Sequence, residues 1–393
     1  MNTLRKIYCR AFQKAFHIAI PFLPYRKPKI AGSVKELPEI IMRHKCTHVL
    51  IITDGGIMKL GLTRRLEKAL KEAGIPYTMY DKTVANPTTV NVREALELYH
   101  KEGCDAIIGF GGGSSMDCAK AVGACAVKPN QSLAQMKGIL KVHKKLPLLI
   151  AIPTTAGTGS EVTCVSVLSD HANGKKAPIV SEGFYPAAAI IDPELTYTMP
   201  PQVTAGTGID VLSHAIEGYW SKGHQPICDV LAMHAAELVF KYVYRAYRKP
   251  DDEEAREKMC EASLIAGLAF TLPKTTSSHA CSFPLTNIYH IPHGEACGLT
   301  LDYFIRINAK GEGGERVEEF ARRIGFKEAE EMADAVLELK KKMGLRCDLK
   351  DLELDDDQIA ELVRISRHPN LYNNPVEITD EMLDEMYRYL AGK

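Results

Sequence analysis

The chain has 393 residues; 46% are hydrophobic, 25% are charged, and 49 basic side chains balance 49 acidic ones. This length predicts two domains, each large enough to bury a core of its own. A chain without an excess of positive charge gives no electrostatic reason to expect a nucleic-acid partner, because phosphate binding needs clustered cations.

Cysteine usage and hydropathy predict a cytoplasmic protein. The 11 cysteines are scattered, odd in number and without a C-x-x-C pair, which indicates reduced thiols. No stretch of the sequence approaches the roughly 20 apolar residues of a membrane-spanning helix. The amino terminus also lacks the apolar run and cleavage site of a secretory signal.

Residues 1–34 predict an amphipathic helix followed by a Pro-rich strap. Apolar side chains recur at helical spacing from Leu4 to Ala19, basic residues lie between them, and Pro21 ends the pattern. We favour packing of this helix against its own domain or a partner subunit over membrane contact or a targeting role.

Residues 35–199 predict an α/β domain with a Rossmann-like, mostly parallel sheet. Short apolar runs with the length and composition of buried strands alternate with helical stretches such as LTRRLEKALKEAG. The predicted strands lie in CTHVLIITD, IPYTMYD, CDAIIGFGGG, LPLLIAIPTT and AAAIIDPEL. A nucleotide would bind at the carboxyl ends of such strands.

Residues 200–393 predict an all-helical domain. Pro200 and Pro201 interrupt the chain, and strand signals nearly vanish beyond them. Helical periodicity is carried by QVTAGTGIDVLSHAIEGYW, DVLAMHAAELVFKYVYRAY, EEAREKMCEASLIAGLAF, RVEEFARRIGF, EEMADAVLELKKKMG and ITDEMLDEMYRYL.

Two loops rich in small residues predict a phosphate-binding edge of the sheet. Each loop follows a predicted strand, and glycine lets backbone N–H groups approach a pyrophosphate while hydroxyls donate to phosphate or ribose oxygens. The candidate residues are Gly112, Gly113, Ser114, Thr154, Thr155 and Thr158. A glycine turn without a ligand is the alternative for either loop alone, and the presence of two loops argues against it.

Carboxylates next to these loops carry two further predictions. Ser114 with Asp117, and Thr158 with Glu161, have the spacing of helix-capping pairs. Asp54 ends the strand VLIIT, where a carboxylate can accept hydrogen bonds from an adenine ribose and would repel a 2′-phosphate, which favours NAD over NADP. The alternative for Asp54 is a turn aspartate before two glycines.

Four residues predict a metal site in the helical domain. Asp210 and His214 are four apart, so that both project from one face of a helix, and His279 and His293 follow at a separation of 14. One carboxylate and three imidazoles leave residual positive charge on a divalent ion and room for a substrate oxygen. A D-x-x-x-H pair alone more often means a surface ion pair or a satisfied core histidine. His290 stays unassigned.

The motifs GGGSSMDCAK, PTTAGTGSEVT, GIDVLSHAIEGY and YHIPHGEACG resemble, in this order and spacing, the iron-containing (group III) alcohol dehydrogenases. The resemblance covers roughly residues 35 to 390. It implies a dehydroquinate-synthase-like architecture, an active cleft between two domains, and ferrous iron, or zinc as the second choice, held by Asp210, His214, His279 and His293. The implied NAD contacts are Asp54, Asn86, Gly113, Ser114, Thr154, Thr155, Thr158, Thr163, Lys176 and Leu195.

The sequence departs from the family at Phe283, where many relatives have a further histidine. This predicts an apolar cleft, which suits an alkyl substrate better than a polyol. Together with the resemblance, it implies hydride transfer between NAD(H) and a small primary alcohol or aldehyde such as butanol or butyraldehyde. A polyol dehydrogenase acting on glycerol or propanediol is the first alternative, and a non-catalytic assembly protein is the second. The resemblance also implies a homodimer or a higher homo-oligomer.

Overall fold

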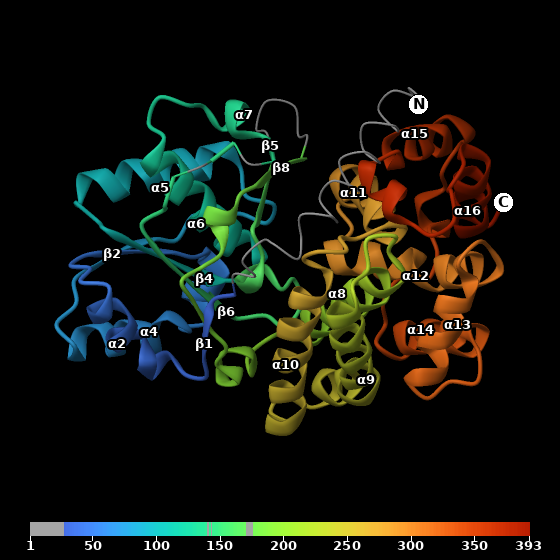
Figure 1. Ribbon diagram of the computed structural model, residues 1–393, viewed down its shortest axis with the longest axis horizontal. Helices are drawn as coiled ribbons and strands as arrows, with labels where there is room; N and C mark the ends of the chain where they lie inside the picture. Colours follow the sequence, from blue (N-terminus) through green and yellow to red (C-terminus); the bar gives the residue numbers. More distant parts are fainter. Residues whose placement is uncertain (1–26, 140, 143, 170–175) are drawn as a thin grey trace. The chain divides into compact units, whose positions relative to one another are not determined.

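The computed structural model describes residues 27–139, 141–142, 144–169 and 176–393 (Figure 1). The helix predicted between Leu4 and Ala19 lies outside the described residues and stays a prediction. The described chain divides into two compact units. The α/β unit contains the described residues of 27–200 together with Pro250–Cys260, and the helical unit contains Pro201–Lys249 and Glu261–Lys393.

The α/β unit is built on a six-stranded sheet in which every adjacent pair is parallel. Its strands are β1 (Lys29–Ala31), β9 (Ala188–Ile190), β6 (Leu148–Pro153), β4 (Ala106–Gly111), β2 (Val49–Ile52) and β3 (Tyr77–Tyr80), in that spatial order. The five predicted strands are thus confirmed. The edge strand β1 was not predicted, because three residues are too few to show periodicity.

Helices cover both faces of this sheet (Figure 1). Alternate side chains of β2 face opposite cores: Ile51 packs in the cluster that includes α2 (Leu37–Arg43) and α4 (Thr63–Glu72). Leu50 packs in the cluster that includes α5 (Thr89–Lys101) and α6 (Gly113–Val127). α6 lies very close to β4, since a Cβ at Gly109 would approach the Met116 Cα to 2.9 Å.

A smaller three-stranded sheet was not predicted. It has the order β5 (Gly138–Ile139), β8 (Lys176–Val180), β7 (Val165–Ser169), with β7 and β8 antiparallel. The remaining short elements of the unit are α3 (Gly55–Lys59), α7 (Leu133–Met136), η2 (Val34–Glu36), η3 (Ser160–Val162), η4 (Glu182–Phe184) and η5 (Pro193–Thr196).

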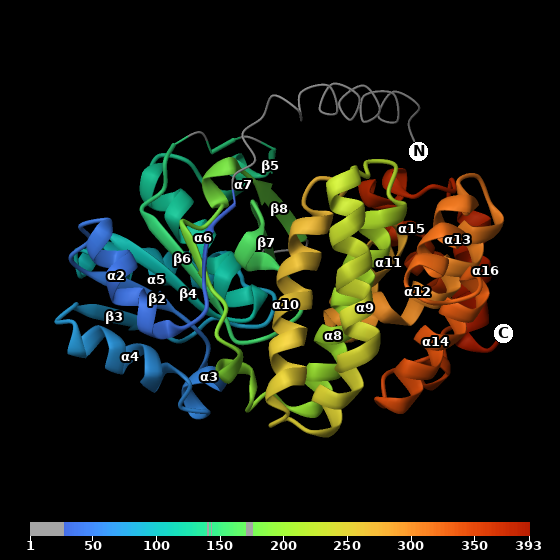
Figure 2. The ribbon, with the colours of Figure 1, turned by 60° about the horizontal axis from the view of Figure 1, so that its bottom comes forward.

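The helical unit contains the six helices expected from periodicity and three that were not expected (Figure 2). The expected helices are α8 (Pro201–Trp220), α9 (Pro226–Arg248), α10 (Glu253–Phe270), α13 (Gly314–Arg323), α14 (Ala329–Lys342) and α16 (Asp380–Ala391). The others are α11 (Ser277–Tyr289), α12 (His293–Lys310) and α15 (Asp356–Ser366), with η6 (Lys350–Leu352) and η7 (Pro369–Asn373). Among the described helices, none is both long and apolar enough to cross a membrane.

The first part of α10 belongs to the α/β unit, although the helix continues to Phe270 in the helical unit. Arg256 on this part is almost completely buried and donates hydrogen bonds to the carbonyl oxygens of Pro250 and Met199, at 2.9 and 3.5 Å. Residues 250–260 are therefore held to the end of the α/β chain segment by a buried guanidinium.

Two glycines of α12 allow it to lie unusually close to α8. A Cβ at Gly294 would lie 2.2 Å from the carbonyl oxygen of Gly206, and one at Gly298 would lie 2.1 Å from Cγ2 of Ile209. Interiors are packed too tightly to admit such contacts, so the helix pair requires glycine at both positions. The same approach puts the start of α12 beside Asp210, whose Cβ is 2.9 Å from the position of a Cβ at Gly294.

We predict that Gly298→Ala lowers the free energy of unfolding by about 1–3 kcal/mol, because the added methyl forces α8 and α12 apart. Denaturant unfolding of the wild type and the variant would measure this difference in the free energy of unfolding. The matched control is Gly206→Ala, whose Cβ would meet its nearest neighbour at 3.9 Å and which should leave stability unchanged or raised by about 0.5–1 kcal/mol. Equal stability of Gly298→Ala and the wild type would contradict the packing argument.

Candidate metal centre and nucleotide-binding loops

α8 presents two of the predicted metal ligands from one buried face. Asp210 and His214 lie one turn apart, and the His214 Nε2 is 4.0 Å from the Asp210 Oδ1. Both side chains are buried. The His214 ring stacks with the rings of Phe270 and His279, at centroid distances of 4.2 and 4.6 Å. The prediction that the pair shares a helix face therefore agrees with the geometry, and the surface ion-pair alternative does not.

α11 and α12 bring the other two predicted ligands to Asp210. One ligand atom from each of Asp210, His279 and His293, together with the sulfur of Cys297, lies within 4.8 Å of the other three. His214 adjoins this group through Asp210 but is not one of its four members. The cysteine was not predicted. His293 is the only partly exposed member of the group, so it marks the accessible side.

The arrangement of Asp210 and His279 fits a bound cation. Asp210 Oδ1 and His279 Nε2 are buried, 3.5 Å apart, and neither has a hydrogen-bond partner among the described residues. A buried polar atom without a partner costs free energy, and a divalent ion between these two atoms would satisfy both. Burial alone would raise the pKa of Asp210, but His214, His279 and His293 outweigh it and hold that pKa below its usual value.

Glu217 fixes the orientation of His279. It lies on α8, is fully buried, and accepts a short hydrogen bond from the His279 Nδ1. Its other oxygen accepts hydrogen bonds from the Thr276 hydroxyl at 2.8 Å and the Ser278 amide at 2.7 Å. Burial raises the pKa of Glu217, but His279 and these hydrogen bonds outweigh it, so the pKa lies below its usual value. A carboxylate on Nδ1 directs Nε2 of His279 toward the Asp210 side.

A similar contact orients His293. Ser282 donates its hydroxyl hydrogen to the His279 carbonyl at 2.8 Å and lies 3.4 Å from the His293 Nδ1. Because that hydrogen is already used, Nδ1 of His293 is the donor in the second contact and Nε2 keeps its lone pair. Two of the three imidazoles are thus preset to act as ligands through Nε2.

The predicted nucleotide residues gather at one edge of the large sheet. Asp54, the glycine loop with Gly112, Gly113 and Ser114, and the threonine loop with Thr154, Thr155 and Thr158 follow the carboxyl ends of β2, β4 and β6, which are neighbours. A Cβ at Gly113 would lie 2.9 Å from Cγ2 of Thr158, and one at Gly112 would lie 3.6 Å from the Thr155 hydroxyl, so the two loops touch. No described side chain caps the start of α6, which leaves its first N–H groups available to an anion.

Neither predicted pair forms a capping box, although the Thr158 hydroxyl accepts a hydrogen bond from the Ser160 amide at 3.3 Å. Gly112 and Gly159 are the N-cap residues of α6 and η3, and neither uses a side-chain cap. Asp117 instead accepts hydrogen bonds from the Ser160 hydroxyl at 2.7 Å and the Val167 amide at 2.9 Å. The buried Lys120 donates to the Ser160 and Thr163 side chains at 2.7 and 3.2 Å and lies 3.6 Å from Asp117. These residues join α6 to the second loop.

Asp54 agrees with both of its interpretations. Its Oδ1 caps α3 by accepting hydrogen bonds from Gly56 and Ile57, at 2.8 and 3.0 Å, as a turn aspartate would. Its Oδ2 faces β4, 3.5 Å from the position of a Cβ at Gly111. One oxygen thus holds the turn while the other lies next to the glycine loop.

The remaining predicted cofactor residues differ in their surroundings. Asn86 has a left-handed backbone conformation, with φ at 56°, and its backbone N–H donates a hydrogen bond to the Ser114 hydroxyl at 3.2 Å. The Thr154 hydroxyl is buried without a hydrogen-bond partner among the described residues, as expected of a ligand-facing group. Leu195 is a fully buried core residue. Lys176 begins β8.

The Phe283 ring lies beside His293 of the metal cluster and also contacts the His368 ring. Phe283 lies with its centroid 6.5 Å from that of His293 and 4.6 Å from that of His368. His368 was not predicted; burial lowers its pKa to about 4, and its Nδ1 accepts a hydrogen bond from the Asn370 amide at 3.3 Å. It is therefore neutral near pH 7, with its proton on Nε2. The unassigned His290 is the exposed, left-handed C-cap of α11, which supports a turn role.

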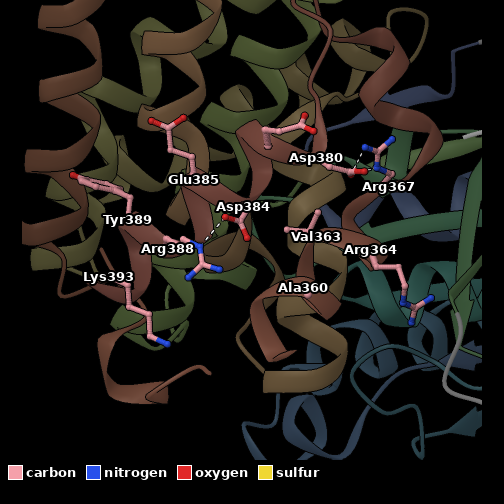
Figure 3. A pocket seen from close by; sticks show the side chains of 11 residues that line it. Ala360, Val363, Arg364, Arg367, Asp380, Asp384, Glu385, Arg388, Tyr389 and Lys393 are labelled. Carbon is pink, nitrogen blue, oxygen red and sulfur yellow. Dashed lines mark hydrogen bonds and ion pairs between the residues drawn. The ribbon is translucent and has the colours of Figure 1, made fainter. Parts of the chain in front are cut away.

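A separate groove of about 790 Å³ runs along α15 and α16 (Figure 3). Four acidic and four basic side chains line it, and Arg388 pairs with Asp384 as Arg367 pairs with Asp380. Its lining includes neither a predicted metal ligand nor a predicted nucleotide residue. This groove is not part of the candidate site.

Comparison with known families and proteins agrees with this geometry. A family described as iron-containing alcohol dehydrogenase matches residues 30–193, and its C-terminal counterpart matches residues 204–391. Alcohol dehydrogenase 4 of Schizosaccharomyces pombe is 33% identical over 95% of this chain and 90% of its own length. The 1,3-propanediol dehydrogenase of Citrobacter freundii is 33% identical over 95% of this chain and 98% of its own.

A solved structure is considerably more similar. The crystal structure of sulfoacetaldehyde reductase from Bifidobacterium kashiwanohense in complex with NAD+ is 55% identical in sequence, with a TM-score of 0.87. The similarity covers 94% of this chain and 98% of that chain.

We predict that Glu217→Gln weakens metal binding by about 10–100-fold, because one oxygen cannot accept all the hydrogen bonds that two carboxylate oxygens accept. Competition with a chelator, followed by metal analysis, would measure this. Glu338→Gln on the exposed face of α14 is the control and should bind metal as the wild type does. Unchanged affinity in Glu217→Gln would show that orientation of His279 does not matter to the site.

Proposed function

Because the chain belongs to the iron-containing alcohol dehydrogenase family, we propose that it interconverts a short aldehyde and its primary alcohol by hydride transfer with NAD(H). Membership confirms the resemblance, the enzyme class, and the cofactors NAD and iron, with zinc the lesser choice. A non-catalytic assembly role is disfavoured, because a structural protein has no use for buried, unsatisfied ligand atoms. Dimerisation and cytoplasmic location stay predictions.

The observation that carries the reaction is the buried cluster around Asp210. We assign Asp210, His214, His279 and His293 as the residues that hold the metal, which supplies Lewis-acid polarisation of the substrate oxygen. Glu217 and Ser282 keep two of the imidazoles in the metal-binding tautomer. The burial of Asp210, His214 and His279 strengthens electrostatic interactions at the reacting oxygen.

The loops of the α/β unit are assigned to the dinucleotide. The uncapped start of α6 and the touching glycine and threonine loops suit the pyrophosphate. Asp54 suits the adenine ribose, since its Oδ2 is not used in capping α3. We assign Lys120 and Thr163 a structural part, because they hold the second loop to α6.

For the substrate we propose sulfoacetaldehyde, reduced to the corresponding hydroxysulfonate. The identity of 55% across almost the whole of both chains, to a reductase of that aldehyde, supports this over other substrates. His368 supports it as well, since an Nε2–H donor beside Phe283 can bind a sulfonate oxygen. Butyraldehyde is the second candidate, because Phe283 alone favours an alkyl chain.

We predict that Asp54→Ser raises the ratio of kcat/KM for NADPH to that for NADH by about tenfold or more, an effect of about 1.4 kcal/mol. Serine can still cap α3, while the charge that would repel a 2′-phosphate is lost. Asp105→Asn, at the amino-terminal end of β4, is the control and should leave the ratio unchanged. An unchanged ratio in Asp54→Ser would count against ribose recognition by Asp54.

We predict that kcat/KM for sulfoacetaldehyde exceeds that for butyraldehyde by at least about 100-fold, because a polar pocket strongly rejects an analogue that leaves its donors unpaired. NADH oxidation would be followed with equal concentrations of each aldehyde, and alcohol oxidation with 1,3-propanediol and glycerol. Faster turnover of butyraldehyde would support the alkyl interpretation of Phe283, and preference for glycerol would support a polyol dehydrogenase.

A further inference from the structure

Cys297 lies inside the metal cluster, although the proposed function gives it no part. It is on α12, one turn after His293, and is fully buried. Its sulfur is 3.9 Å from Nε2 and 4.0 Å from Nδ1 of His293. With one atom each of Asp210, His279 and His293 it forms a group whose members all lie within 4.8 Å of one another.

If the Cys297 thiol only filled space in the core, the state of its polar neighbours would be unexplained. Asp210 and His279 are each more than nine-tenths buried, and their facing atoms have no hydrogen-bond partner among the described residues. A thiol has one hydrogen and cannot satisfy a carboxylate oxygen and an imidazole nitrogen together. A cation shared by all of these atoms can.

The distances agree with a shared ion. Metal–sulfur bonds of about 2.3 Å and metal–nitrogen bonds of about 2.1 Å put sulfur and nitrogen ligands of one ion about 3.5–4 Å apart. The sulfur of Cys297 and the Nε2 of His293 meet this condition at 3.9 Å. Position alone also favours the contact, since residues four apart on a helix project from the same face.

We propose that Cys297 binds the metal ion through its sulfur, as a further protein ligand of the centre assigned above. The inference rests on that assignment for the presence of a metal. On binding, the S–H bond breaks, its proton passes to solvent, and the thiolate forms the sulfur–metal bond without any change of oxidation state. The ligand set thereby gains a soft donor, which suits zinc better than oxygen and nitrogen donors alone do.

Cobalt(II) substitution provides a readout that does not depend on turnover. The metal is removed from the full-length protein and replaced by one Co²⁺ per chain without oxygen. We expect the wild type to show a sulfur-to-cobalt charge-transfer absorption in the near ultraviolet. Cys297→Ser should lose this band and keep the weaker visible bands of cobalt bound to nitrogen and oxygen. Cys228→Ser, which removes another buried thiol on α9, is the matched control and should keep the band.

Zinc affinity provides the second measurement. Cys297→Ser and Cys297→Ala should both lose zinc to a competing chelator at least about tenfold more readily than the wild type and Cys228→Ser do. If the Cys297 variants fail to fold, the wild-type cobalt spectrum still decides the matter.

The possible failures are distinguishable. A wild type that binds cobalt without a charge-transfer band, or a Cys297→Ser protein that keeps the band, overturns the sulfur ligand and leaves the metal centre intact. A wild type that binds no cobalt, zinc or iron overturns both the centre and the inference.

Discussion

A carboxylate oxygen and an imidazole nitrogen, both buried and both without a hydrogen-bond partner among the described residues, face each other across 3.5 Å in the helical unit. Without a cation this arrangement is unfavourable, and much of the surrounding structure serves to impose it. Gly294 and Gly298 let α12 pack closely against α8, and Glu217 binds the His279 ring at Nδ1, the nitrogen away from Asp210. The helical unit therefore spends stability on a site that only a metal ion completes.

Much of the α/β unit could be predicted, because buried parallel strands are continuous apolar runs separated by helices with clear periodicity. The small sheet could not, since β5 has two residues and its pairing with β8 is a tertiary event. In the helical unit α11 was missed because Pro284 lies inside it, and α12 because Pro292 and two glycines obscure its start. The apolar spacing of these helices reflects contacts with neighbouring helices more than exposure to solvent.

The sequence predicted some residues of the candidate metal and nucleotide sites and missed others. The four ligands proposed from residue type and spacing do gather around Asp210, although His214 lies outside the closest group. Glu217 was missed, yet its signal was present: it is seven residues after Asp210, on the same helix face. Cys297 could have been found by the same spacing from His293. The Ser114–Asp117 capping pair failed because Asp117 bonds to Ser160 of the second loop, a partner 43 residues away in the sequence.

The path of the backbone between the units limits how the protein can be dissected. The chain passes from the α/β unit to the helical unit after Pro200, returns for residues 250–260, and leaves again within α10. An expressed fragment ending near residue 200 would lack the returning segment and its buried Arg256. Neither unit is encoded by one continuous stretch of the chain. Fragment complementation would therefore have to supply residues 250–260 to the amino-terminal fragment, as a separate peptide or by circular permutation.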